Sequence, residues 1–142
     1  MEKKLILFQK IYDFTLWLYP VINRIPRHHK TVLGRQIEEL TVSMLLVVLS
    51  ANRARGKKRA EFQLVISEDL DKLRILIRLT KDLRFMSIKQ YVYSSEKVNE
   101  IGKILSGWMR ATTDGHKVTA KPEPASPKKP VAKAPQNLTL FD

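Results

Sequence analysis

Three cationic side chains, Arg74, Arg78 and Lys81, recur at the spacing i, i+4 and i+7, which places them on one face of a helix. Like charges at this spacing repel one another by about 0.2–0.5 kcal/mol. Such a row is favoured when an anionic partner neutralises it, as nucleic-acid phosphates do. Asp71 and Asp82 flank the row, so ordinary surface ion pairs on a solvated helix face are the alternative.

A second cationic cluster, NRARGKKR, occupies residues 52–59, and five of these eight residues are Lys or Arg. Gly56 interrupts the helical pattern here, so we expect the cluster at a turn between two helices. Flexible cations in a turn contact phosphates and release counterions from nucleic acid. The alternative is a solvated turn that binds no ligand.

The net charge of the 142-residue chain is +12, and most of it lies outside the C-terminal segment. Residues 1–112 carry 21 Lys and Arg against 11 Asp and Glu, whereas residues 113–142 carry 5 against 3. A positive excess within a folded region predicts a surface that attracts polyanions. Solubility alone is the alternative explanation.

Residues that usually carry catalysis or bind metals do not form a set in this chain. His28 and His29 are adjacent, so they point in different directions, and His116 lies far along the chain. The absence of cysteine excludes a thiol nucleophile and a cysteine-bound zinc site. The sequence contains no glycine-rich phosphate loop. We therefore expect a protein that is not an enzyme and uses no metal or cofactor.

Four helices must position these cations, and apolar residues at three- and four-residue spacing predict them at 2–23, 30–55, 58–83 and 95–112. Their inward faces are predicted to be, helix by helix, Leu5, Phe8, Tyr12, Leu16 and Tyr19; Leu33, Ile37, Leu40, Met44, Val47 and Ala51; Phe62, Ile66, Leu70, Leu73 and Ile77; and Val98, Ile101, Leu105 and Trp108. Short connections between long helices favour an antiparallel up-down arrangement. The expected fold is an all-α four-helix bundle over residues 1–112.

The connector at 84–93 has no clear helical period and contains the β-favouring residues Tyr91, Val92 and Tyr93. Its structure is left open. Ser94 or Ser95 is the predicted N-cap of the last helix.

Two features of the helices point to an interface. Residues 44–49 are apolar around the whole circumference of the second helix, so a second face is expected to be buried by another subunit. Gly102 and Gly107 each cost about 1 kcal/mol in a helix interior relative to alanine. Close approach of a helix or a subunit would explain why glycine stands there.

From Thr113 the composition changes, and five prolines stand among Lys, Ala and Ser. This predicts a flexible tail over residues 113–142. No apolar run approaches the about 20 residues that span a membrane, and the N-terminus lacks the apolar core and cleavage site of a signal peptide. We expect a cytoplasmic protein without a membrane partner.

Three blocks of sequence, LYPVINRIPRHHK at 18–30, LRILIR at 73–78 and IGKILSGWMR at 101–110, together resemble one known family. This is the accessory variability determinant (Avd) family of diversity-generating retroelements. The last block is the most specific of the three. The first block is shared with four-helix-bundle proteins encoded in ribosomal-RNA intervening sequences, which are the alternative and would have a structural or RNA-associated role.

The resemblance implies a bundle that assembles into a positively charged, ring-like homopentamer. It also implies a non-catalytic protein that binds a reverse transcriptase and template-repeat RNA, in support of mutagenic cDNA synthesis (mutagenic retrohoming). By matching position, it makes Arg27, Arg74, Arg78 and Arg110 contacts for one of these partners. With the basic clusters included, the candidate contacts are Arg27, Lys30, Arg53, Arg55, Lys57, Lys58, Arg59, Arg74, Arg78, Lys81 and Arg110.

The end of the tail, with Gln136, Leu138, Leu140 and Phe141, resembles the short peptides that bind bacterial sliding clamps. A few apolar anchors at the end of a flexible linker suit such recognition. An apolar end that folds back on the bundle is the alternative.

Deleting residues 136–142 is therefore expected to abolish binding to purified sliding clamp, because the apolar anchors are lost. RNA affinity, measured in parallel on the same variant, should stay unchanged. Clamp binding as strong without these residues would contradict the interpretation.

Overall fold

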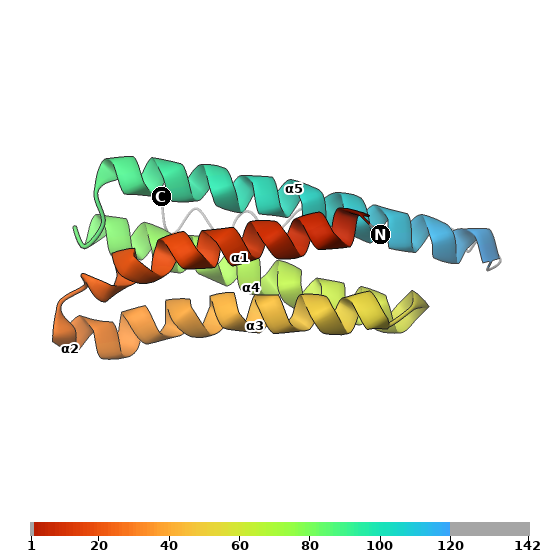
Figure 1. Ribbon diagram of the computed structural model, residues 1–142, viewed down its shortest axis with the longest axis horizontal. Helices are drawn as coiled ribbons and strands as arrows, with labels where there is room; N and C mark the ends of the chain where they lie inside the picture. Colours follow the sequence, from red (N-terminus) through yellow and green to blue (C-terminus); the bar gives the residue numbers. More distant parts are fainter. Residues whose placement is uncertain (1, 120–142) are drawn as a thin grey trace, which may run out of the picture.

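The computed structural model describes residues 2–119, which form helices joined by short turns (Figure 1). In chain order the elements are α1 (Glu2–Asn23), α2 (Arg27–His29), the π-helical turn η1 (Lys30–Gly34), α3 (Arg35–Arg53), α4 (Gly56–Asp82) and α5 (Ile88–Thr119). This described part of the chain contains no strand, and none of its helices has the length and apolar character to cross a bilayer.

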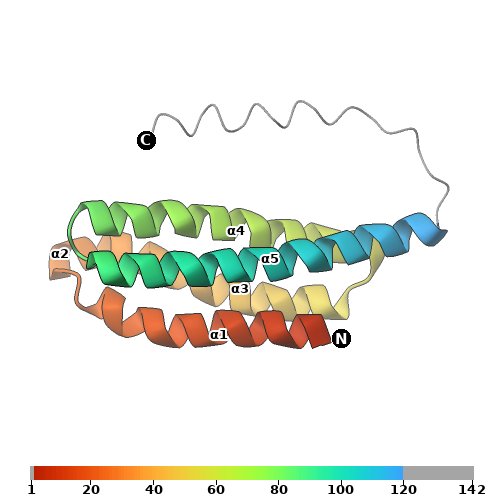
Figure 2. The same cartoon turned by 90° about the horizontal axis from the view of Figure 1, so that it is seen from above.

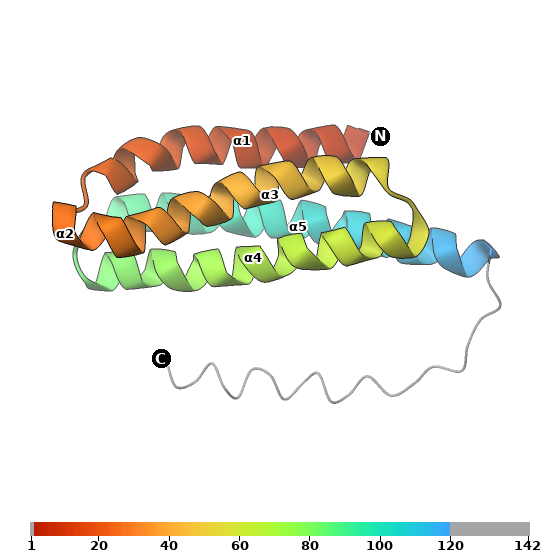
Figure 3. The ribbon, with the colours of Figure 1, turned by 90° about the horizontal axis from the view of Figure 1, so that it is seen from below.

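The four long helices pack side by side, with α1 and α4 each in contact with both α3 and α5 (Figure 1, Figure 2). Successive long helices run in opposite directions. Figure 3 shows α2 and the α4–α5 turn at one end of the bundle, and the α3–α4 turn at the end where α1 begins. The predicted all-α, up-down four-helix bundle is confirmed.

Each long helix contributes one apolar face to a shared core. The inward faces predicted for the second, third and fourth helices are confirmed, since all their residues are buried or packed against the core. On α5, for example, Val98, Ile101, Leu105 and Trp108 are all buried. Burial of such side chains is the main favourable term in folding, at about 25 cal/mol per Å².

The inward face predicted for α1 is wrong. Tyr12, Leu16 and Tyr19 are exposed, Phe8 is only partly buried, and the side chain of Leu5 lies outside the described part of the structure. The core is instead lined by Leu7, Ile11, Phe14, Leu18, Val21 and Ile22. Apolar residues cover most of the circumference of α1, and the face without tyrosines packs inward. The one hydroxyl buried with it, of Thr15, donates to the Ile11 carbonyl at 2.7 Å.

The second predicted helix begins with the π-helical turn η1, and α3 ends at Arg53. Gly34 lies where this turn passes α1. A Cβ on Gly34 would lie 3.0 Å from Cγ2 of Ile22 and 3.1 Å from Cγ of Lys30. The small residue therefore allows the chain to pass close to the core after it leaves α1.

The last helix begins at Ile88, and the prediction that it begins near Ser95 is wrong. Ser87 Oγ accepts a hydrogen bond from the Gln90 N–H at 3.0 Å, and Gln90 Oε1 accepts one from the Ser87 N–H at 3.0 Å. This reciprocal capping box starts the helix. Tyr91, Val92 and Tyr93 follow it and are therefore helical despite their β propensity.

The helix also continues past Thr112, where the prediction ended it, to Thr119. Residues 113–119, which were predicted as the start of a flexible tail, are helical. Residues 120–142 lie outside the described part of the chain. The prediction of a clamp-binding motif at Gln136, Leu138, Leu140 and Phe141 therefore stays a prediction.

Candidate nucleic-acid interface

A groove of about 620 Å³ lies between α4 and α5 and collects cations from both helices. It contains two of the predicted contacts, Arg74 from α4 and Arg110 from α5, together with Lys103, which sequence analysis missed. Its lining residues are Ser67, Leu70, Asp71, Arg74, Asn99, Gly102, Lys103, Leu105, Ser106 and Arg110. The groove thus presents cations and small hydroxyls, which are the groups that bind phosphate oxygens.

The side chain of Arg74 reaches from α4 to α5 and is held by contacts with both helices. Its Nη1 donates a hydrogen bond to Asn99 Oδ1 at 2.6 Å, and its Nε lies 3.9 Å from Asp71 Oδ1. A Cβ on Gly102 would lie only 3.0 Å from Nη2 of this guanidinium. Glycine at position 102 therefore makes room for the Arg74 side chain, and this explains a residue that is unfavourable in a helix interior.

We expect Gly102→Ala to keep or raise the thermal stability, since alanine favours the helix by about 1 kcal/mol and the guanidinium can move aside. RNA affinity should fall, because Arg74 leaves its position. If the contact between Arg74 and RNA weakens by about 1 kcal/mol, the dissociation constant should rise roughly fivefold. Fluorescence anisotropy with labelled single-stranded RNA measures it.

The matched control is Gly115→Ala, also in α5, where a Cβ would meet nothing within 4 Å. It should gain the same helix propensity without any change in RNA affinity. Equal affinity of both variants would mean that the position of Arg74 over Gly102 has no role in binding.

Arg78 and Lys81 continue the row along α4 as predicted. Arg78 lines a second hollow between α4 and α5, beside Arg74, and its Nε lies 3.8 Å from Asp82 Oδ2. Lys81 Nζ lies 2.9 Å from Asp82 Oδ1 and 4.7 Å from the centre of the Tyr91 ring. The ion pairs proposed as the alternative are present, but exposed pairs contribute only about 0–1 kcal/mol and are screened by salt, so a phosphate can compete with them.

We call Arg74, Arg78, Lys81, Lys103 and Arg110 the α4–α5 seam. Its members come from two helices that pack against each other, with the C-terminal end of α5 projecting beyond α4 (Figure 2). Sequence analysis could not find Lys103, because only the pairing of α4 with α5 brings it next to Arg74.

The NRARGKKR cluster lies at the α3–α4 turn, away from most of the seam (Figure 3). Arg53, Arg55 and Lys57 are exposed, and Lys58 lies 3.8 Å from Glu61. Arg59 is engaged in the fold. Its guanidinium donates to the carbonyls of Ala51 and Asn52 at 3.0 Å each, where α3 ends, and lies 5.7 Å from the Trp108 ring.

Arg27 and Lys30 lie at the opposite end of the bundle, at α2 and η1. The side chain of Lys30 donates to Asn23 Oδ1 at 2.6 Å. Here the His29 ring lies 4.9 Å from that of Phe85, so the turn after α1 contacts the α4–α5 turn. The predicted contacts therefore fall into three regions, and Arg74, Arg78, Lys81 and Arg110 belong to the seam.

The far side of the bundle carries apolar residues that the core does not use. Leu16 of α1 and Leu46 of α3 are 60% and 59% exposed. Together with Tyr12, Tyr19, Val42 and Leu49 they form what we call the α1–α3 face, which contains a shallow groove of about 620 Å³. The side chains of residues 44–49 thus point both inward and outward, and the burial of the outward side by another subunit stays a prediction.

A second apolar surface lies on α4. Ile75, Leu79 and Leu83 are exposed and recur at i, i+4 and i+8, so they follow one another along one side of the helix. We call them the α4 face. It lies on a different helix from the α1–α3 face, and the two apolar surfaces are neighbours, because Glu39 and Ser43 line both the groove of the α1–α3 face and a hollow that contains Ile75.

One ion pair connects α1 to α5, between Lys10 Nζ and Glu100 Oε2 at 2.8 Å. The hydrogen bond with Lys10 lowers the pKa of Glu100, and the same bond raises the pKa of Lys10. Both groups are exposed, so solvent screens the pair and its contribution to stability is small. Within residues 2–119, no group of three or more His, Asp or Glu side chains is arranged to hold a metal ion.

A family model described as bAvd-like matches residues 5–112 of the chain. The match covers α1 to α4 and the part of α5 that carries the seam, and it leaves out the C-terminal segment. No match was found among curated proteins.

Proposed function

Because the chain belongs to the bAvd-like family, we propose that it is the accessory protein of a diversity-generating retroelement. In this role it binds the element's reverse transcriptase and its template-repeat RNA, and supports mutagenic synthesis of cDNA without catalysing the reaction itself. The observation that carries the nucleic-acid part is the α4–α5 seam, in which Arg74, Lys103 and Arg110 from two helices line one groove.

The seam suits an RNA backbone for three reasons. Its cations lie along neighbouring helices, so they can contact successive phosphates of one strand. Arg74 is positioned before binding by Asn99 and Gly102, which reduces the entropy lost on binding. The carboxylates beside the seam, Asp71 and Asp82, make only exposed ion pairs, which a phosphate can replace.

We further propose that the chain assembles with copies of itself through the α1–α3 face and the α4 face. Two different apolar surfaces on one subunit suit a head-to-tail contact, in which one face of each subunit meets the other face of the next. Such contacts close into a ring when the rotation between subunits allows it. The family resemblance predicts a pentamer, which is one such ring.

A genetic experiment tests the proposed role. In a cell whose retroelement is active, deletion of the gene for this chain should abolish the transfer of adenine-directed mutations from template repeat to target gene. The full chain supplied from a plasmid should restore transfer. Undiminished transfer in the deletion strain would contradict the proposal.

A further inference from the structure

The turn after α4 contains a residue that its backbone conformation does not favour. Arg84 has φ of 69°, and it is the only non-glycine residue with positive φ in the described part of the chain. The Phe85 N–H donates to the Thr80 carbonyl at 3.0 Å and the Arg84 N–H to the Lys81 carbonyl at 2.9 Å. This pair of bonds is the Schellman ending of a helix, in which the left-handed position is usually glycine. An arginine at this position is uncommon, because a side chain disfavours the left-handed conformation.

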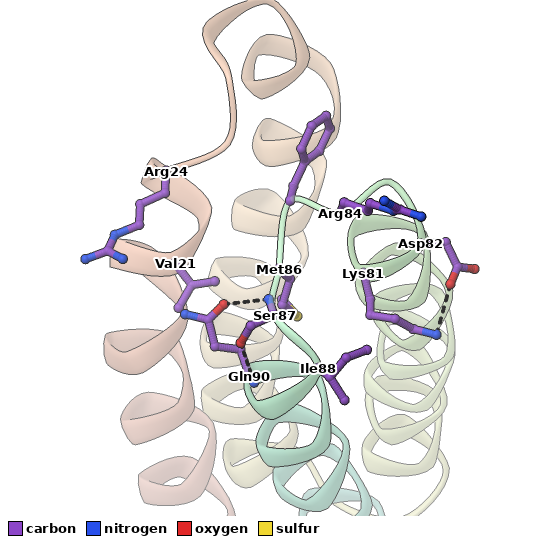
Figure 4. A pocket seen from close by; sticks show the side chains of 10 residues that line it. Val21, Arg24, Lys81, Asp82, Arg84, Met86, Ser87, Ile88 and Gln90 are labelled. Atoms are coloured by element: carbon purple, nitrogen blue, oxygen red, sulfur yellow. Dashed lines mark hydrogen bonds and ion pairs between the residues drawn. The ribbon is translucent and has the colours of Figure 1, made fainter.

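A pocket of about 690 Å³ lies beside this turn (Figure 4). Val21, Phe85, Met86 and Ile88 provide apolar lining, and Met86 is only 5% exposed. Ser87 and Gln90 also line it, and their reciprocal hydrogen bonds hold this part of the lining in place. The pocket thus combines an apolar surface with a small number of fixed polar groups, as ligand sites commonly do.

The charges around the pocket are mostly positive. Arg24 stands at one side and Arg84 at the other, with Met86, Ser87 and Gln90 between them, and both arginine side chains extend outward in this view (Figure 4). Lys81 also lines the pocket, and the one carboxylate among the lining residues, Asp82, lies 2.9 Å from Lys81 Nζ. An anionic ligand that extends past the rim of the pocket on both sides would therefore approach a cation on each side.

An aromatic surface adjoins the pocket. The Phe85 ring, which lines it, lies 4.9 Å from the His29 ring, and His29 lies 4.1 Å from the His28 ring. Both histidines are exposed. Aromatic rings beside cations are the combination that binds single-stranded nucleic acid, because bases stack on the rings while cations contact the phosphates.

We propose that this pocket binds one nucleotide of single-stranded RNA, as a site separate from the Arg74 and Arg110 groove. The base packs against Phe85 and Met86, and the phosphates on its two sides reach Arg24 and Arg84. The inference rests on the proposed RNA binding of this chain and adds a second site to it. It also gives Arg84 its function at a position where glycine would fit without strain.

The test is Arg84→Gly in the full chain, because this substitution relieves the backbone while it removes the cation. We expect the melting temperature to stay equal or rise and the RNA dissociation constant to increase about tenfold. The slope of log K against log salt should become smaller by the contribution of about one phosphate contact. Lys97→Gln, which removes one charge from the α1–α5 side, is the control and should change affinity much less. An Arg84→Gly variant that binds RNA as tightly as the unchanged chain overturns the proposal.

A second measurement separates this site from the proposed function. In methyl NMR of the full chain, uridine 5′-monophosphate at millimolar concentration should shift the Met86 signal and leave that of Met109 in place. A Met86 shift with this probe but no RNA binding would keep the pocket and reject the proposed function. If RNA binds but neither RNA nor the mononucleotide shifts the Met86 signal, the pocket is rejected and the proposed function is kept.

Discussion

Replacing Arg74 and Arg78 together by glutamate is expected to weaken binding of single-stranded RNA about a hundredfold, since two charge-assisted phosphate contacts of roughly 1.5 kcal/mol each are lost. The salt dependence should become shallower, with the slope of log K against log salt smaller by about 1.4 for two contacts to a single strand. Binding to the reverse transcriptase should fall as well if the polymerase uses the same surface. Anisotropy titrations at several salt concentrations measure the RNA effect.

The fold should tolerate this change. Both side chains lie at the surface of α4, beside the core, and their ion pairs with Asp71 and Asp82 are exposed. New repulsion with these carboxylates costs about 0.2–0.5 kcal/mol per pair, so helicity by circular dichroism should be unchanged.

The matched control is the double change Arg53→Glu with Arg55→Glu at the α3–α4 turn. It alters the net charge equally but leaves the seam intact. If it weakens RNA binding as much as the seam variant, then the seam is not the specific site, and overall charge or the basic cluster at 52–59 explains the affinity. If the seam variant binds both RNA and polymerase normally, the seam is not the interface.

The second large effect concerns assembly. Leu16→Asp with Leu46→Asp should convert the proposed oligomer to monomers, because its assembly would bury two charges without partners in the α1–α3 face. These side chains are largely exposed in the single subunit, so its stability should change little. Light scattering coupled to gel filtration gives the mass, and Val92→Asp, on an exposed part of α5 outside both faces, is the control.

A mixing experiment then distinguishes head-to-tail from symmetric contacts. Leu79→Asp alters only the α4 face, and it too should give monomers. Mixed with the Leu16 and Leu46 variant, it should form dimers and nothing larger, because just one intact pair of faces remains. Persistence of a full-size oligomer in either variant would show that these faces do not hold the subunits together.

The sequence predicted the bundle well where each helix has one apolar face. Val98, Ile101, Leu105 and Trp108 could be assigned to the core because the other sides of that segment are polar. On α1 the same reasoning chose the outward face, since both sides are apolar and only packing against α3 and α5 decides between them. The start of α5 was missed because residues 84–93 show no clear helical period and include β-favouring residues, so the N-cap was placed at Ser94 or Ser95 and the capping box at Ser87 and Gln90 was not recognised.

The candidate site was predicted only in part, for a different reason. The row of Arg74, Arg78 and Lys81 follows from spacing along one helix, which the sequence displays directly. Lys103 and Arg84 gain their significance from contacts between helices and from a backbone conformation, and neither can be read from spacing. For Arg59 the sequence suggested a role that its contacts do not support directly. It belongs to the basic cluster, but its guanidinium donates hydrogen bonds to backbone carbonyls at the end of α3.

We propose that this chain works with a reverse transcriptase and its template RNA. Isolation of the tagged full chain from its native cells, with identification of the bound proteins and RNAs, tests this. We expect to recover a retroelement reverse transcriptase together with RNA from its template repeat. Recovery of ribosomal RNA without any polymerase would overturn the proposal and favour a role like that of the intervening-sequence proteins.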